Sequence, residues 1–164
     1  TRNPVGPLGT VHCRRYHHGG STVLIGDAAH AIVPFFGQGM NASFLDCLRL
    51  AECLHAHASA LDALAAYDST QRPDGAAIAE LSLRNFIEMR DHTASPLFRL
   101  LQRCRKRLNR MAPRLYAPLY NMVSFTTIPY TSVIAIDRRR RWGLRLCLLA
   151  LVLLPVIYVA FLSN

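Results

Sequence analysis

The segment STVLIGDAAHAIVPFFGQGMN, residues 21–41, decides how the chain is organised. It opens with an aliphatic and β-branched run, Ser21–Ile25, which is typical of a buried strand, and Gly26-Asp27 ends that run. A loop without charged residues follows and closes with Gly37-Gln38-Gly39, directly before apolar residues recur at helical spacing. The sequence therefore predicts a strand, an acid at its carboxyl end, a glycine loop and a helix.

This order of residue types is suited to binding a flat, hydroxyl-bearing cofactor. An acid at the end of a strand can accept hydrogen bonds from a sugar-type hydroxyl, and glycines let a ligand approach the backbone closely. The backbone N–H groups around Gly39, Met40 and Asn41 would lie at a helix start, which favours electron-rich or anionic groups. By chemistry alone an ordinary turn and helix cap explains the pattern equally well, so both interpretations stay open.

The elements around this segment follow from its flanks. Strands are expected over Thr10–Tyr16 and Ser21–Ile25, with Gly19-Gly20 in a hairpin turn. A helix over 40–58 comes after the glycine loop. We expect a shorter helix over Leu61–Gln71 to stop before Pro73, which then opens a third helix.

The third helix carries an unusual stripe, in which two polar residues stand among apolar ones. Two alternatives explain it: the stripe rotates toward solvent beyond Leu81, or its polar groups point into a pocket. Its members are Ile78, Leu81, Asn85, Glu88, Met89 and His92.

The net charge of +9 over 164 residues is unevenly distributed. Residues 1–93 carry seven basic and nine acidic residues, whereas residues 94–164 carry twelve basic residues and one acidic residue. A basic half of this kind usually faces an anionic partner such as nucleic acid, lipid headgroups or an acidic protein. The five cysteines have no paired spacing and the histidines lack i,i+4 pairs, so we expect reduced cysteines and no metal site.

The basic half contains two segments suited to a membrane surface. Residues 97–111 form a basic amphipathic pattern that could lie on a membrane, bind a partner protein or pack on the protein's own core. Arg138–Arg141 precedes the uncharged stretch Leu146–Leu162, whose 17 residues would span about 25 Å as a helix. We interpret this end as a C-terminal membrane anchor with the arginines on the cytosolic side. Nucleic-acid binding by the arginine run is the weaker rival.

The string GDAAHAIVPFFGQGMN resembles the second flavin-binding motif of the class A flavoprotein aromatic hydroxylases, GDAAH…P…G-Q-G-x-N. The segments LRNFIEMR and PLYNMVSF lie downstream and extend the resemblance over about residues 21–130. These two segments narrow the resemblance to the kynurenine-hydroxylating branch of that family. It implies an α+β, mostly helical fold. Residues 1–58 would be the C-terminal part of a Rossmann-like FAD-binding domain, residues 59–136 a helical region contributing to the substrate pocket, and residues 137–164 a basic flank with a transmembrane helix.

The same resemblance implies roles for individual residues. Asp27 would hold the ribityl chain of FAD, and the backbone at Met40 and Asn41 would face the pyrimidine edge of the flavin. The cofactor-binding residues implied are Asp27, Pro34, Gly37, Gly39, Met40 and Asn41. Those implied for the substrate are Phe35, Phe36, Asn85, Glu88, Met89 and Tyr120. No residue is assigned as a catalytic acid or base.

The full-length protein implied by the resemblance hydroxylates L-kynurenine to 3-hydroxy-L-kynurenine with FAD, NADPH and O2 at the cytosolic face of the mitochondrial outer membrane. The sequence contains no GxGxxG dinucleotide fingerprint. We therefore interpret the chain as a C-terminal fragment that by itself neither holds FAD tightly nor turns over, its partner being the missing N-terminal portion. The alternative is a non-enzymatic, membrane-tethered adaptor that uses residues 97–111.

Overall fold

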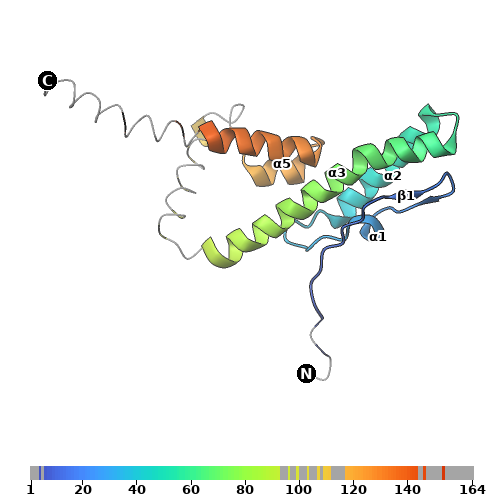
Figure 1. Ribbon diagram of the computed structural model, residues 1–164. Helices are drawn as coiled ribbons and strands as arrows, with labels where there is room; N and C mark the ends of the chain where they lie inside the picture. Colours follow the sequence, from blue (N-terminus) through green and yellow to red (C-terminus); the bar gives the residue numbers. More distant parts are fainter. Residues whose placement is uncertain are drawn as a thin grey trace, which may run out of the picture.

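The computed structural model describes residue 4, residues 6–92 and 117–143, and positions 96, 99, 103, 107, 109–111, 146 and 153. This part of the chain is mostly helical, as the sequence predicted, with one small hairpin (Figure 1). The hairpin strands are the only strands among the described residues, so these contain no doubly wound sheet of the Rossmann type.

The hairpin pairs β1 (His17–His18) with β2 (Thr22–Val23) in antiparallel register. Gly19 supplies the turn with φ +55°, which confirms the predicted hairpin. The predicted first strand, Thr10–Tyr16, is wrong, whereas β2 lies within the predicted second strand, Ser21–Ile25. The Tyr16 backbone N–H donates to the Asp68 carboxylate at 2.7 Å, and the chain before it forms no ladder. No third described strand covers β2, and Ile25, which was expected in a buried strand, is 38% exposed.

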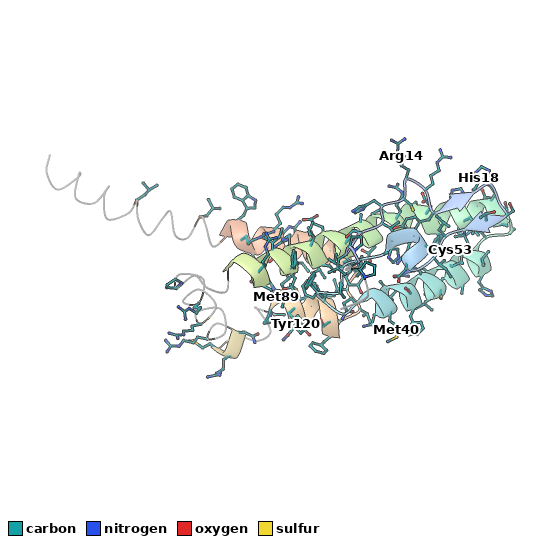
Figure 2. The ribbon with its side chains drawn as sticks, turned by 90° about the horizontal axis from the view of Figure 1, so that it is seen from below. Arg14, His18, Met40, Cys53, Met89 and Tyr120 are labelled. Carbon is teal, nitrogen blue, oxygen red and sulfur yellow. The ribbon has the colours of Figure 1, made fainter. Side chains whose placement is uncertain are left out.

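Two helices flank the glycine loop. The short α1 spans Asp27–His30, and α2 spans Gly39–Ala56, within two residues of the predicted helix at each end. The apolar stripe of α2 faces outward: Met40, Phe44 and Leu48 are each more than half exposed, and Met40 projects away from the body of the protein (Figure 2). The opposite side of α2 buries small and polar side chains, among them Asp46, which is fully buried.

The next helix, α3, runs without interruption over Ala60–Ile87 and contains Pro73 in its interior. The predicted break at that proline is wrong. A proline inside a helix removes one hydrogen bond and costs about 3 kcal/mol. The helix continues through the proline because α3 packs along α2. Tyr67 before the proline and Ile78 after it are both fully buried, which fixes the two halves of the helix in line. A turn of π-helix, η1 (Glu88–His92), extends the end of α3.

Beyond the described stretch that ends at residue 92, α5 (Leu119–Phe125) and a helix over residues 130–143 pack on the far half of α3 (Figure 1). The start of the last helix is held by Asp74 of α3, whose Oδ1 accepts from the Thr131 backbone N–H at 2.9 Å and from its hydroxyl at 3.0 Å. The larger core cluster joins these elements and consists of Phe36, Ala42, Ala77, Ile78, Leu81, Met122, Val123, Tyr130 and Val133.

Part of the predicted basic flank folds back on this core. Arg140 donates to the Ala117 carbonyl at 2.5 Å, and Asp137 pairs at 3.1 Å with both Arg84 and Arg141. Among the described residues, no helix combines the length and the apolar character needed to cross a bilayer. The predicted anchor over Leu146–Leu162 and the basic helix over 97–111 lie outside the described residues, apart from single positions.

Candidate functional site

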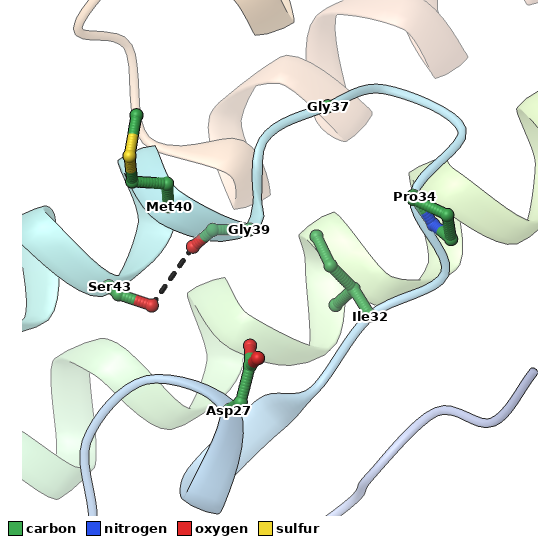
Figure 3. A pocket seen from close by; sticks show the side chains of 7 residues that line it. All are labelled: Asp27, Ile32, Pro34, Gly37, Gly39, Met40 and Ser43. Carbon is green, nitrogen blue, oxygen red and sulfur yellow. Dashed lines mark hydrogen bonds between the residues drawn. The ribbon is translucent and has the colours of Figure 1, made fainter.

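A pocket of about 440 Å³ opens between α1, the glycine loop and the start of α2 (Figure 3). The Asp27 side chain points across it toward Gly39 and Ser43, and Ile32 and Pro34 lie along the connecting loop. Asp27 was predicted to bind the same ligand as the start of α2. In the structure it faces that helix start across the pocket. The complete lining is Asp27, Ile32, Pro34, Gly37, Gly39, Met40 and Ser43.

Glycine is required where the loop enters and leaves this pocket. Gly26 has φ +60°, and a Cβ there would lie 3.0 Å from the Ser43 hydroxyl, so the turn before Asp27 docks closely on α2. Gly37 has φ +65°, which side-chain-bearing residues rarely adopt. These two positions fix the path of the chain from Asp27 to the start of α2.

The start of α2 carries no side-chain cap. Gln38, the residue before it, is buried, and its side-chain oxygen accepts from the Asn41 amide at 2.9 Å instead. The first N–H groups of a helix have no acceptor within the helix, and they attract anionic or electron-rich groups. Gly39 and Met40 bring this helix start into the pocket wall, whereas Asn41 stands outside the lining.

Directly behind the pocket lies a buried ion pair that sequence reasoning missed. Asp46 of α2 accepts at 2.7 Å from Nε2 of His30 and at 2.7 Å from the Gly26 backbone N–H. Burial of the imidazole acts to lower the pKa of His30, but the hydrogen bond and charge of Asp46 outweigh it, so that pKa is raised above 6.5. A signal for Asp46 exists in the sequence: it is an acid on the face of α2 opposite the apolar stripe.

The residues predicted for the substrate form an aromatic cluster on the other side of the loop. Phe35 stacks on Phe86 of α3 at 4.4 Å between ring centroids, and Phe36 stacks on Tyr120 of α5 at 5.8 Å. Phe36 is 6% exposed and belongs to the larger core, whereas Tyr120 is half exposed and also meets Phe125 edge-on at 6.0 Å. Two adjacent phenylalanines of the loop therefore attach it to two different helices, α3 and α5.

The polar stripe of α3 turns toward the surface beyond Leu81, as the first alternative expected. Leu81 is fully buried, Asn85 is half-buried and Met89 is 54% exposed. The Asn85 amide donates to the Phe35 carbonyl at 2.7 Å, so this side chain fastens the loop to α3. Glu88 is half-buried and begins η1. None of these residues lines the pocket that contains Asp27, and their assignment to a substrate stays a prediction.

Comparison with known proteins bears on the pocket region directly. A family described as an FAD binding domain matches residues 7–82, which include the hairpin, α1, the loop, α2 and most of α3. The matched region is therefore similar to the FAD binding domain family over 76 of the 164 residues.

Most of the chain is similar in sequence to proteins named kynurenine 3-monooxygenase. It is 43% identical over 140 residues to the kynurenine 3-monooxygenase of Salinispora tropica, an alignment that covers 85% of this chain and 31% of the relative. It is 44% identical over 133 residues to that of Xanthomonas campestris pv. campestris strain B100, covering 81% and 29%. The chain thus spans about a third of the length of these relatives.

The matching family is described as an FAD binding domain, and the pocket has features that suit one side of that cofactor. The pocket contains a carboxylate acceptor, a helix start without a side-chain cap and a loop shaped by glycine. Its volume of about 440 Å³ lies within the usual range of small-molecule pockets, roughly 300–1,000 Å³. The pocket brings together five of the six residues that the sequence assigned to the cofactor: Asp27, Pro34, Gly37, Gly39 and Met40.

Proposed function

We propose that this chain forms part of an FAD-dependent monooxygenase that hydroxylates L-kynurenine to 3-hydroxy-L-kynurenine with NADPH and O2. The observation that carries the proposal is the shared pocket of Asp27 and the start of α2, within the region that matches the FAD binding domain family. The name shared by the relatives supports the substrate and the reaction. NADPH as the reductant rests on the resemblance of the GDAAH and GQGMN motifs.

In this proposal the chain holds and orients one side of the cofactor. Asp27 accepts hydrogen bonds from the ribityl hydroxyls, and the start of α2 at Gly39 and Met40 stabilises negative charge on the flavin ring. Bound FAD supplies the redox chemistry, because it can be reduced by NADPH and can activate O2. Stacking of Phe35 and Phe36 on neighbouring rings keeps the loop in place and excludes water from one flank.

The substrate residues act from the opposite side of the loop. Tyr120 is half exposed at the end of the aromatic cluster and could present its hydroxyl to a polar substrate group. Asn85 spends one amide N–H on the Phe35 carbonyl, and its carbonyl oxygen is a further acceptor. We expect Asn85 to contribute to substrate binding mainly by fixing the loop.

The decisive test is Asp27→Ala in the full-length protein that contains this chain. Loss of a hydrogen-bonding carboxylate should weaken FAD binding at least about tenfold, because hydrogen bonds to charged groups are each worth roughly 1.5–3 kcal/mol. The measurement is the dissociation constant of FAD by fluorescence quenching, with kynurenine-dependent NADPH oxidation as the second readout. Asp62→Ala, an exposed acid in the first turn of α3, is the matched control. Unchanged FAD affinity in Asp27→Ala would refute the assignment.

We also propose that Leu146–Leu162 anchors the protein in the mitochondrial outer membrane with its catalytic part facing the cytosol. The support is the uncharged stretch and the preceding Arg138–Arg141. A fluorescent reporter fused to residues 134–164 should remain with membranes on carbonate extraction. Recovery of the reporter in the soluble fraction would contradict insertion.

A further inference from the structure

The buried carboxylate of Asp46 contacts both ends of the short helix that carries Asp27. Its Oδ2 accepts from the backbone N–H of Gly26, the residue before α1, and from the side chain of His30, the last residue of α1, each at 2.7 Å. Asp46 is 0% exposed and His30 is 3% exposed. A single oxygen therefore ties the first residue of the GDAAH turn, through its backbone, and the last, through its side chain, to α2.

Because Asp46 is a buried carboxylate, its hydrogen bonds to Gly26 and His30 are needed to stabilise it. A carboxylate removed from water needs a cationic or hydrogen-bonding partner, and loss of that partner leaves an uncompensated buried charge. The other oxygen of Asp46 has no hydrogen-bond partner among the described residues, so Oδ2 carries the known contacts. The Tyr16 ring lies 5.9 Å from the His30 ring, and the Tyr67 ring lies 6.3 Å from that of Tyr16, between centroids. Burial, and then the nearby charge of Asp46, raises the pKa of Tyr16 to about 12 and also raises the pKa of Tyr67.

The turn and α2 meet at a second point on the pocket side. A Cβ at Gly26 would stand 3.0 Å from the Ser43 hydroxyl, and Ser43 lines the pocket one turn before Asp46 on the same helix. Asp46 thus holds the turn from behind while Ser43 limits how closely it approaches in front. A shift of this turn would move Asp27 relative to Gly39, because Asp27 is the first residue of α1.

We propose that Asp46 and His30 are positioning residues for the cofactor: together they hold the GDAAH turn so that the Asp27 carboxylate faces the start of α2 across the pocket. The inference rests on the proposed FAD site. It assigns no contact with the flavin to either residue. Both act through Asp27, and their effect on the cofactor should disappear when Asp27 is absent.

The test is a double-mutant cycle on FAD affinity in the full-length apoprotein. Asp46→Asn keeps the shape and one acceptor oxygen but removes the charge, and it should weaken FAD binding roughly tenfold in the wild-type background, since coupled contacts commonly interact at this level. In the Asp27→Ala background the same change should alter affinity less than about twofold. Glu52→Gln, a half-exposed acid on α2, is the control and should leave affinity unchanged.

Circular dichroism and thermal unfolding of the apoprotein check that each variant folds. If Asp46→Asn does not fold, His30→Gln takes its place in the cycle with the same expected pattern. An unchanged affinity, or an equal loss in both backgrounds, overturns the inference while leaving the FAD site intact. If Asp27→Ala alone has no effect on FAD affinity, the proposed function and the inference both fail.

Discussion

Replacement of Gly75 by alanine tests how closely α3 packs against the turn that carries Asp27. Gly75 is buried in α3, and a Cβ there would lie 2.5 Å from Oη of Tyr16 and 2.9 Å from Cδ2 of His30. Neither neighbour can move freely, because Tyr16 is buried at 2% exposure and the His30 side chain is bound to Asp46.

Two opposite effects determine the sign of the change. Alanine is favoured over glycine inside a helix by about 1 kcal/mol. Overpacking of a core typically costs about 1–3 kcal/mol, and two contacts below 3.0 Å against restrained rings place this site in the upper part of that range. We therefore expect Gly75→Ala to lower the free energy of unfolding by about 1–2 kcal/mol.

The assay is urea unfolding followed by circular dichroism, with Ala76→Gly as the control at an exposed neighbouring position of α3. Ala76→Gly should cost about 1 kcal/mol through helix propensity alone. Tyr16→Phe removes the nearest atom, so Gly75→Ala should cost less in that background. If Gly75→Ala stabilises the protein by about 1 kcal/mol, the close packing inferred here is refuted.

Three further predictions concern single contacts. Asn85→Ala removes the bond to the loop carbonyl and should destabilise the protein by about 1 kcal/mol, and under the proposed function it should raise the KM for kynurenine; unchanged stability and KM would contradict this role. Because the pKa of His30 is raised in the folded state, its stabilising contribution is full below its unfolded pKa of about 6.5 and is lost as pH rises through the folded value. The stability difference between wild type and His30→Gln in urea unfolding should therefore shrink above about pH 6.5, and a difference independent of pH would count against the pair with Asp46. Asp74→Ala should cost about 1–2 kcal/mol by uncapping the helix that starts near Thr131, whereas Asp74→Asn should cost less; equal thermal unfolding of both variants would show that the cap is unimportant.

The local order around the pocket could be predicted from the sequence because glycines, turns and apolar spacing act over short distances. The hairpin turn at Gly19, the helix after Gly39 and the proximity of Asp27 to that helix follow from such signals. The opposite holds for Pro73, where local propensity predicted a break. There the burial of Tyr67 and Ile78 on either side overrides the proline.

The ion pair behind the pocket could not be predicted in the same way. His30 and Asp46 are separated by 16 residues, and their meeting depends on how α2 turns relative to α1. From its apolar stripe of Met40, Phe44 and Leu48, this side of α2 would be expected to face a core. In the structure the stripe is exposed, and Asp46 on the opposite side is buried. The spacing of apolar residues shows that a helix has an apolar and a polar face. Only the tertiary contacts identify which face is buried.

The uninterrupted course of α3 has a practical consequence for dissecting this protein. The FAD binding domain match ends at residue 82, inside a helix that continues to Ile87. A truncation at that boundary would discard Asn85 and Phe86, and with them both attachments of Phe35 to α3. A domain excised by sequence family alone would therefore retain Asp27 but release the loop beside it, and weak flavin retention by such a piece would reflect the cut.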